Sequence, residues 1–408
     1  MNREELSLLL KEHRQEHILT YYDKLSQDDK DKLAAQIEKV DWRLINLIPQ
    51  ENAQQKNGRY EPLAGVSIEQ IEFNKKLYYD IGIKTIQGSK VAAVLLAGGQ
   101  GTRLGCEGPK GIVNIGISKE IFIFEVVLKN ILKVAKEANT WIPLYIMTSI
   151  KNNEQTISFL KEHDFFGYPE EFITFYIQDM TPSVDNDAKL LMETPSQLSL
   201  SPNGNGGWFS SMVKANLLND LYDRKIEWIN VFAVDNVLQK IADPVFIGAT
   251  IASNKFSGAK VVRKANPHER VGVLCLEDGK PSIVEYYEMT DEMINARNDN
   301  GELSYSYGVI LNYLFRLDKL KEIIKLDLPI HVVKKKIPYL TDDGRYIEPE
   351  KANGYKFEEL VLDMVHLFDN CLPFEVIREN EFAPIKNASG DDSISTAQKL
   401  LINQGYIL

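Results

Sequence analysis

The sequence has few cysteines, few histidines and no long apolar run. Three cysteines and six histidines occur among 408 residues. Cys106, Cys275 and Cys371 are odd in number and far apart, which indicates neither a disulfide framework nor a zinc knuckle. The most apolar strand-like run, residues 91–97, is far shorter than the roughly 20 residues of a membrane span, and the first residues are acidic where a signal peptide is basic. We therefore expect a soluble protein of a reducing compartment, the cytoplasm.

Positive charge is also in short supply. Lys and Arg total 47 against 58 Asp and Glu, which gives a net charge of −11 at pH 7. This balance argues against a protein that wraps nucleic acid or lies on an anionic membrane, so we expect neither as a partner. A small anionic ligand is compatible with it where basic side chains gather locally. The sequence also contains neither an HExxH pair nor a Gly-x-Ser-x-Gly elbow, which argues against a zinc peptidase and a nucleophilic hydrolase.

The composition is otherwise that of a globular protein, with 44% hydrophobic and 26% charged residues. The chain is long enough for two to three domains of about 150 residues. Residues 1–88 have apolar positions at helical spacing and predict a helical region, with helices over 4–25, 28–47 and 68–81 and an irregular link at 54–65. Residues 89–341 predict an α/β domain. Residues 342–408 predict a C-terminal segment with turns and a helix near 357–368.

An alternation of strands and helices begins at the apolar run 91–97, which suits a strand buried on both faces of a sheet. Residues 144–148, 173–177 and 229–234 repeat the strand pattern, and residues 124–135 have the spacing of a crossover helix. Residues 271–276 and 282–287 flank a turn and predict a hairpin. We expect a doubly wound α/β fold on a mixed sheet with an N-terminal helical layer, in which ligands lie at the carboxyl ends of the strands.

The strongest functional motif is LAGGQGTRLG at residues 96–105, followed closely by Lys110. Gly98, Gly99 and Gly101 come directly after a buried strand and allow the backbone to approach a ligand with its N–H groups. Arg103 and Lys110 add positive charge. The loop therefore offers a polyphosphate both hydrogen-bond donors and compensating charge.

Two other nucleotide motifs fail on spacing. A Walker A loop ends in Gly-Lys-Ser/Thr, which is not found here, and a dinucleotide fingerprint has a third glycine where Leu104 stands. A tight strand-to-helix turn without any ligand is the remaining alternative for this loop.

Other candidate positions are weaker when taken singly. Asp235 follows the strand pattern that ends at residue 234, where a carboxylate can hold Mg²⁺ between phosphate oxygens or simply cap a turn. The glycine cluster at 202–207 can present backbone groups and the Asn205 amide to a base or sugar, or form a surface turn. Lys356 and Lys386 are each ordinary surface lysines on their own.

Taken together, these segments closely resemble the eukaryotic-type UDP-sugar pyrophosphorylases, above all the UDP-N-acetylglucosamine pyrophosphorylases, from about residue 61 to 397. The resemblance rests on motifs in a shared order: LAGGQGTRLG (96–105) with PKG (109–111), IPLYIMTS (142–149), KEHDFFGY (161–168), NGNGG (203–207), VFAVDNVLQKIADPVFIG (231–248), VGVLC (271–275) with VEYYE (284–288), KKKIPY (334–339) and FAPIKNA (382–388). So many ordered matches are highly specific.

The resemblance implies a nucleotide-diphospho-sugar transferase-like, Rossmann-like fold and a set of site residues. Nucleotide contacts are implied at Leu96, Ala97, Gly98, Gly99, Gly101, Thr102, Gln178 and Gly204. Catalytic or phosphate-binding roles are implied for Arg103, Lys110, Lys356 and Lys386, and a Mg²⁺ ligand at Asp235. Sugar contacts are implied at Asn205, Gly272, Glu285, Tyr286 and Val309.

Two departures from the family pattern affect what is transferred. The family's sugar-binding Gly-Asn-Ile segment is here Gly308-Val309-Ile310, so an apolar side chain replaces a hydrogen-bonding amide. Such a loss costs about 1–3 kcal/mol where the partner stays buried and unpaired. The chain also ends soon after Asn387, where longer members continue into a C-terminal domain. We expect a short form without that domain, and no oligomer is indicated.

The implied reaction joins UTP and a sugar 1-phosphate to give a UDP-sugar and pyrophosphate. We expect N-acetylglucosamine 1-phosphate as the acceptor, attacking the α-phosphorus of UTP in line with the leaving group and assisted by Mg²⁺. The same chemistry on glucose 1-phosphate, galactose 1-phosphate or several sugars is one alternative. A UDP-sugar-binding regulator that does not catalyse is the other.

Overall fold

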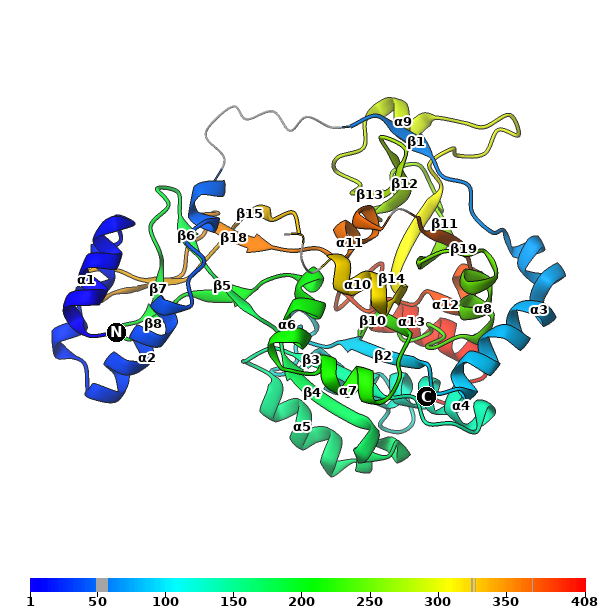
Figure 1. Ribbon diagram of the computed structural model, residues 1–408, viewed down its shortest axis with the longest axis horizontal. Coiled ribbons are helices and arrows are strands. Elements are labelled where there is room, and N and C mark those ends of the chain that lie inside the picture. Colours follow the sequence, from blue (N-terminus) through cyan, green and yellow to red (C-terminus); the bar gives the residue numbers. More distant parts are fainter. Residues whose placement is uncertain (49–57, 324–325, 327, 369) are drawn as a thin grey trace. The chain divides into compact units, whose positions relative to one another are not determined.

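The computed structural model describes residues 1–48, 58–323, 326, 328–368 and 370–408. The chain forms two compact units, each assembled from three separate stretches (Figure 1). Unit 1 comprises Met1–Lys56, Asp179–Gly207 and Leu328–Val361. Unit 2 comprises Asn57–Gln178, Trp208–Asp327 and Leu362–Leu408.

Unit 2 is built on a ten-stranded mixed sheet with the order β1-β12-β14-β10-β2-β3-β4, in which β13 pairs with β12 and β11 pairs with both β14 and β19. Neighbouring strands β10, β2, β3 and β4 are parallel, so their carboxyl ends lie at one edge of the sheet, and β14 is antiparallel to β10. The bounds of the strands are β1 (Tyr60–Pro62), β2 (Val91–Leu96), β3 (Leu144–Thr148), β4 (Ile173–Ile177), β10 (Trp228–Ala233), β11 (Ser257–Arg263), β12 (Val273–Glu277), β13 (Lys280–Val284), β14 (Tyr307–Arg316) and β19 (Leu372–Glu375).

Helices cover both faces of this sheet. Successive residues of a strand point to opposite faces, so neighbouring residues of β3 contact different layers. Leu144 and Ile146 of β3 pack into the main apolar core. Tyr145, between them, donates a hydrogen bond from its hydroxyl to Asp220 of α7 on the other side, at 2.5 Å. The helices of this unit are α3 (Ile68–Gln87), α4 (Ile123–Ala138), α5 (Asn153–Glu162), α6 (Trp208–Lys214), α7 (Leu218–Asp223), α8 (Pro244–Ala252), α9 (Asp291–Asn295), α10 (Leu317–Ile323), α12 (Arg378–Glu381) and α13 (Ile394–Asn403), with α11 (Val361–Leu367) beginning at the boundary between the units.

Helices α3 and α8 lie side by side with their backbones in contact (Figure 1). A Cβ at Gly82 would lie 1.8 Å from the Pro244 carbonyl oxygen, and a Cβ at Gly248 would lie 1.7 Å from the Tyr78 carbonyl oxygen. Only glycine therefore permits this approach. The start of α8 is fixed by Asp243, whose carboxylate accepts a hydrogen bond from the Val245 N–H at 3.0 Å.

Unit 1 joins two N-terminal helices to short strands from two later stretches of the chain. The helices are α1 (Arg3–Glu12) and α2 (Gln27–Glu38), and their apolar faces share a core with Val184, Leu198 and Phe357. The strands form three small sheets from β5 (Met180–Pro182), β6 (Val184–Asp185), β7 (Met192–Thr194), β8 (Gln197–Leu198), β9 (Leu200–Pro202), β15 (His331–Lys335), β16 (Tyr339–Leu340), β17 (Tyr346–Ile347) and β18 (Gly354–Glu358).

The doubly wound mixed sheet predicted from the sequence is confirmed. Strands β2, β3, β4 and β10 occupy the predicted runs to within a residue or two, and α4 contains the predicted crossover helix. β12 and β13 form the predicted hairpin. Among the described residues, no helix combines the length and the apolar character needed to cross a bilayer.

Three details differ from the expectations. The N-terminal helices are divided between the two units: α1 and α2 pack in the core of unit 1, whereas α3 packs on α8 in unit 2. The link expected to be irregular contains strand β1, whose residues pair with β12, while its residues 54–57 lie outside the described part. The consecutive regions 1–88, 89–341 and 342–408 also do not coincide with the two units, since residues 179–207 and 328–361 join the N-terminal helices.

Candidate active site

The glycine loop that follows β2 is closed by its own backbone. The N–H of Gly101 donates to the Gly108 carbonyl at 2.8 Å, and the N–H of Lys110 donates to the Gly99 carbonyl at 3.1 Å. A Cβ at Gly101 would lie only 2.9 Å from the Cys106 Cβ, so the turn requires glycine there. The ends of the loop therefore lie together, which places Lys110 beside the glycines that precede it by about ten residues.

The face of the loop around Gly99 is open. No described atom lies within 4 Å of the position that a Cβ would take at Gly99. Thr102 and Arg103 are exposed on the short 3-10 helix Thr102–Leu104 that follows. Leu96 and Ala97, by contrast, are buried at the end of β2, where the loop begins. The predicted nucleotide-binding segment thus has a buried base and an accessible rim.

A buried asparagine that the sequence did not single out holds this loop in place. Asn152 is fully buried, and its Nδ2 donates to the Ala97 carbonyl at 2.9 Å and to the Gly99 carbonyl at 3.3 Å. Its Oδ1 accepts from the Ser149 N–H at 2.8 Å. One amide therefore ties the glycine loop to the carboxyl end of β3. No motif marked it, because its partners are backbone groups far away in the sequence.

We expect Asn152→Ala to weaken UTP binding by about tenfold and to destabilise the fold by about 1–3 kcal/mol, since it leaves buried backbone groups unpaired. Asn153→Ala is the matched control, because Asn153 is the next residue but bonds the Thr148 hydroxyl at 2.7 Å and not the loop. Calorimetric titration with UTP and thermal unfolding of both variants check this. Equal UTP affinities for the two variants would contradict the role given to Asn152.

Gln178 lies directly against the glycine loop. It follows β4, is 5% exposed, and its Oε1 is 3.0 Å from the position of a Cβ at Gly98. Ser149, at the end of β3, approaches Gly98 from another side, with its Cβ at 3.7 Å from the same point. The buried Ser149 hydroxyl has no hydrogen-bond partner among the described residues. Gly98 and Gln178, predicted to bind the nucleotide, are therefore brought together, and Ser149 is a further candidate donor there.

The predicted phosphate and metal residues Lys110 and Asp235 also meet. Asp235 follows β10, and its Oδ2 lies 3.6 Å from the Nζ of Lys110. Lys110 is only 9% exposed. Burial lowers the pKa of its ammonium, an effect that Asp235 opposes and that the positive charges of Arg103 and Lys386 reinforce. Asp235, Arg103 and Lys386 are thus all close enough to Lys110 to influence its charge.

Lys386 is brought to this site by the backbone around it. The N–H of Ile385 donates to the Asp235 carbonyl at 2.9 Å, and the N–H of Val237 donates to the Ala383 carbonyl at 3.3 Å. The Asn236 side chain strengthens the link, because its Oδ1 accepts from the Ala383 N–H at 2.9 Å. The Lys386 ammonium lies 3.3 Å from Asp392. Segments about 150 residues apart therefore run side by side here, and Asn236 is a second residue whose role the sequence did not reveal.

The donor set suits a magnesium ion that is shared with a substrate. Among the described residues, no three His, Cys, Asp or Glu side chains gather at one point. Asp235 is a single, partly exposed carboxylate at the edge of the sheet, with cationic groups around it. Mg²⁺ is commonly bound by one or two carboxylates together with substrate phosphates and water. The residues present therefore fit that mode and do not form a closed metal cage.

Three of the predicted sugar residues lie together: Val309 is on β14, Gly272 directly precedes β12 and Glu285 directly follows β13. The N–H of Val309, on β14, donates to the Gly272 carbonyl at 2.9 Å. A Cβ at Gly272 would lie 3.4 Å from the Glu285 Oε1 and 3.5 Å from a Val309 methyl. Tyr286 is 41% exposed and stacks edge-on against Tyr287. The cluster thus combines one carboxylate, one apolar side chain and a glycine that keeps the space between them open.

Gly204, Asn205 and Lys356 belong to unit 1. Gly204 has a φ of +86°, and a Cβ there would lie 2.2 Å from the Glu359 carbonyl oxygen, so the turn requires glycine. The Oδ1 of Asn205 accepts from the Val361 N–H at 2.9 Å. Lys356 is a half-buried residue of β18, opposite Val333 of β15. The turn at 203–207 and the strand that carries Lys356 are therefore neighbours within this unit.

Comparison with known proteins agrees with this architecture. The family model described as UTP–glucose-1-phosphate uridylyltransferase matches residues 23–405. A mouse UDP-N-acetylhexosamine pyrophosphorylase-like protein 1 is 34% identical over 96% of this chain and 82% of its own length. The UDP-N-acetylglucosamine pyrophosphorylase of Saccharomyces cerevisiae is 34% identical over 96% of this chain and 88% of its own length. The crystal structure of the Trypanosoma brucei UDP-N-acetylglucosamine pyrophosphorylase with an inhibitor superposes with a TM-score of 0.85, at 28% identity, covering 99% of this chain and 85% of that one.

The sheet, its order and its structural relatives define a sugar nucleotidyltransferase fold. The chain belongs to the UTP–glucose-1-phosphate uridylyltransferase family, which contains the UDP-sugar pyrophosphorylases named above. The resemblance drawn from the sequence motifs is therefore confirmed.

Proposed function

We propose that the protein is a uridylyltransferase that makes a UDP-sugar and pyrophosphate from UTP and a sugar 1-phosphate, with N-acetylglucosamine 1-phosphate as the preferred acceptor. The observation that carries this proposal is the gathering of the glycine loop, Lys110, Asp235 and Lys386 at the carboxyl ends of β2 and β10. The names of its relatives in mouse and yeast support the N-acetylated sugar.

The reaction places two polyanions next to each other, so its main requirements are positioning and neutralisation of charge. The phosphate oxygen of the sugar 1-phosphate is already anionic near pH 7 and needs no strong base. The backbone N–H groups around Gly99 and the side chain of Arg103 hold the UTP phosphates, and Gln178 reads the uracil edge beside Gly98. Lys110 and Lys386 neutralise the charge that develops on the departing pyrophosphate.

Asp235 would hold Mg²⁺ together with phosphate oxygens of the substrate. When bound, Mg²⁺ supplies Lewis-acid polarisation of the phosphoryl group. The same carboxylate faces the Nζ of Lys110 at 3.6 Å and so also holds that ammonium at the site. For Gly204, Asn205 and Lys356 of unit 1 the proposal keeps the roles that the resemblance implies, as contacts to uracil, sugar and phosphate in that order.

The test is pyrophosphate release from UTP and Mg²⁺ with N-acetylglucosamine 1-phosphate, beside glucose, galactose and N-acetylgalactosamine 1-phosphates. We expect release with the N-acetylated sugars. Release with the other sugars only would keep the chemistry and reassign the substrate. No release with any of them, together with calorimetric binding of a UDP-sugar, would instead favour a regulator that does not catalyse.

Val309 gives a second, more local test of sugar choice. Its side chain stands where the family has an amide, and one of its methyls lies 3.5 Å from the position of a Cβ at Gly272, which Glu285 Oε1 approaches at 3.4 Å. We expect Val309→Asn to raise kcat/KM for N-acetylglucosamine 1-phosphate relative to glucose 1-phosphate by about fivefold to 150-fold, the range of one restored hydrogen bond of about 1–3 kcal/mol. Val333→Asn on β15 is a control for the same change on a strand of unit 1. An unchanged preference between the two sugars would show that position 309 does not face the acceptor.

A further inference from the structure

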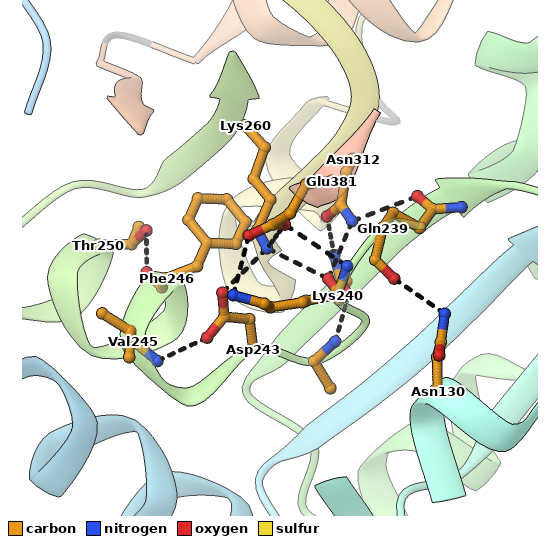
Figure 2. A network of polar contacts seen from close by, with 12 residues as sticks. Asn130, Gln239, Lys240, Asp243, Val245, Phe246, Thr250, Lys260, Asn312 and Glu381 are labelled. Carbon is orange, nitrogen blue, oxygen red and sulfur yellow. Dashed lines mark hydrogen bonds and ion pairs between the residues drawn. The ribbon is translucent and has the colours of Figure 1, made fainter. Parts of the chain in front are cut away.

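A buried ionic cluster lies behind the site described above. Lys260, on β11, is fully buried, and its Nζ contacts Asp243 Oδ2 at 2.9 Å and Glu381 Oε2 at 2.5 Å (Figure 2). It also donates to the Lys240 carbonyl at 3.2 Å. Burial by itself lowers the pKa of Lys260, but the two carboxylates outweigh this and raise it. The two carboxylates therefore favour the charged form of this buried lysine.

The cluster joins three segments that are distant in sequence. Asp243 begins helix α8, Lys260 lies in the middle of β11, and Glu381 is the last residue of α12. Both carboxylates are nearly buried, at 7% and 4% exposure. The exposed Lys240 completes the set, with its Nζ 3.4 Å from Glu381 Oε1. Two positive and two negative charges therefore balance, which is the condition under which buried charges are tolerated.

The same cluster is one step away from the residues of the proposed site. The Glu381 carbonyl accepts a hydrogen bond from Asn236 Nδ2 at 2.8 Å, and Asn236 is the neighbour of Asp235. Beyond Glu381 the chain continues along the Asp235 segment to Ile385, whose N–H donates to the Asp235 carbonyl, and then to Lys386. On the other side, Gln239 Nε2 donates to the Asn236 carbonyl at 2.8 Å. The loop between β10 and α8 is thus held at both ends.

We propose that Lys260 and Glu381 are positioning residues for uridylyl transfer: their buried ion pair fixes the start of the 381–386 segment and so places Lys386 beside Asp235. Neither residue touches substrate. Four residues of chain separate Glu381 from Lys386, and two of them, Ala383 and Ile385, are hydrogen-bonded to the Asp235 segment. The inference rests on the proposed function for its kinetic consequence, whereas the ordering of the 381–386 segment can be measured independently of it.

Glu381→Gln is the variant that tests this link, because it keeps the shape of the side chain and removes its charge. Glu375→Gln is the matched control: Glu375 lies six residues earlier, is 7% exposed, and pairs with Arg263 at 3.0 Å without contacting the Asp235 segment. Both variants lose one carboxylate from an ion pair in the same unit. Hydrogen exchange of the Ile385 and Lys386 amides and pyrophosphate release with N-acetylglucosamine 1-phosphate are measured for each.

We expect Glu381→Gln to speed exchange at Ile385 and Lys386 and to lower kcat by about tenfold, while Glu375→Gln changes neither by more than about twofold. A double-mutant cycle with Lys386→Met then separates positioning from general stability. If Glu381 acts through Lys386, Glu381→Gln has no further effect on kcat when Lys386 is already methionine. Equal losses with and without Lys386 would overturn the proposal.

Lys240→Met keeps the test decisive if Glu381→Gln does not fold. It removes only the exposed partner of Glu381, and we expect faster exchange at the same two amides, to a smaller extent. Unchanged exchange in every folded variant would overturn the proposal. An unmodified enzyme that releases no pyrophosphate with any of the four sugars would refute the proposed function instead, and the exchange data would still decide whether the ion pair orders the segment.

Discussion

Replacing Lys110 with alanine is expected to lower kcat by about 100-fold to 1000-fold, the loss typical of removing one group that stabilises developing negative charge. The affinity for UTP should fall by less than about tenfold. Lys110 is nearly buried at the end of the glycine loop, with its Nζ 3.6 Å from Asp235 Oδ2. We therefore expect its charge to stabilise the departing pyrophosphate more strongly than it stabilises bound UTP, since the backbone donors of the loop already hold the nucleotide.

The measurement is steady-state pyrophosphate release at saturating UTP, combined with calorimetric titration of UTP into the variant. Lys90→Ala is the control. Lys90 stands at the opposite end of the same strand, half-exposed and paired with Glu227 at 2.8 Å, so its loss should leave kcat within about twofold. Turnover in Lys110→Ala equal to that of the control would remove Lys110 from the mechanism.

Much of unit 2 could be predicted because its strands and motifs leave strong local patterns. The run at 91–97 is apolar at every position, which a strand buried on both faces requires, and β2 is buried along its whole length. The glycine loop was visible because its spacing follows that strand directly. Lys110 and Asp235 could be paired only through the family resemblance, since they come from strands that are adjacent in the sheet but distant in the sequence.

Unit 1 left no comparable pattern, because its strands are mostly two or three residues long and pair across stretches far apart in the chain.

The motif at 161–168, in unit 2, shows a different limit of prediction from sequence. Asp164, Phe165, Phe166 and Gly167 have φ values of 48°, 46°, 51° and 83°, a left-handed turn that propensity alone disfavours for aromatic residues. Phe165 is buried there, and Phe166 packs against the His163 ring. Tertiary packing, which a sequence pattern does not show, outweighs the local cost.

The buried polar groups were hardest to foresee. Lys260 stands between Ala259 and Val261 on β11, and nothing near it in the sequence identifies Asp243 and Glu381 as its partners. No sequence pattern marks Asn152 or Asn236 either, since each forms hydrogen bonds with backbone groups that are distant in sequence and that only the fold brings near. Residues that bind substrate leave motifs, whereas residues that hold those motifs in place become visible only in three dimensions.

Asp235→Asn should have the other large effect, a fall in kcat of at least about 100-fold with a rise of about tenfold or more in the Mg²⁺ concentration needed for half-maximal rate. The amide keeps the shape of the carboxylate but loses the charge that binds a hard cation. Asp223→Asn, an exposed carboxylate at the end of α7, is the control and should change neither quantity. Pyrophosphate release is titrated with Mg²⁺ for both variants.

Asp235 also faces Lys110, so its loss has two effects that this titration separates. A loss of metal affinity is relieved by high Mg²⁺, whereas a misplaced Lys110 is not. A variant whose rate is low and independent of Mg²⁺ would mean that Asp235 serves mainly to position the lysine, and the metal ligand would then have to be sought among the substrate's own phosphates.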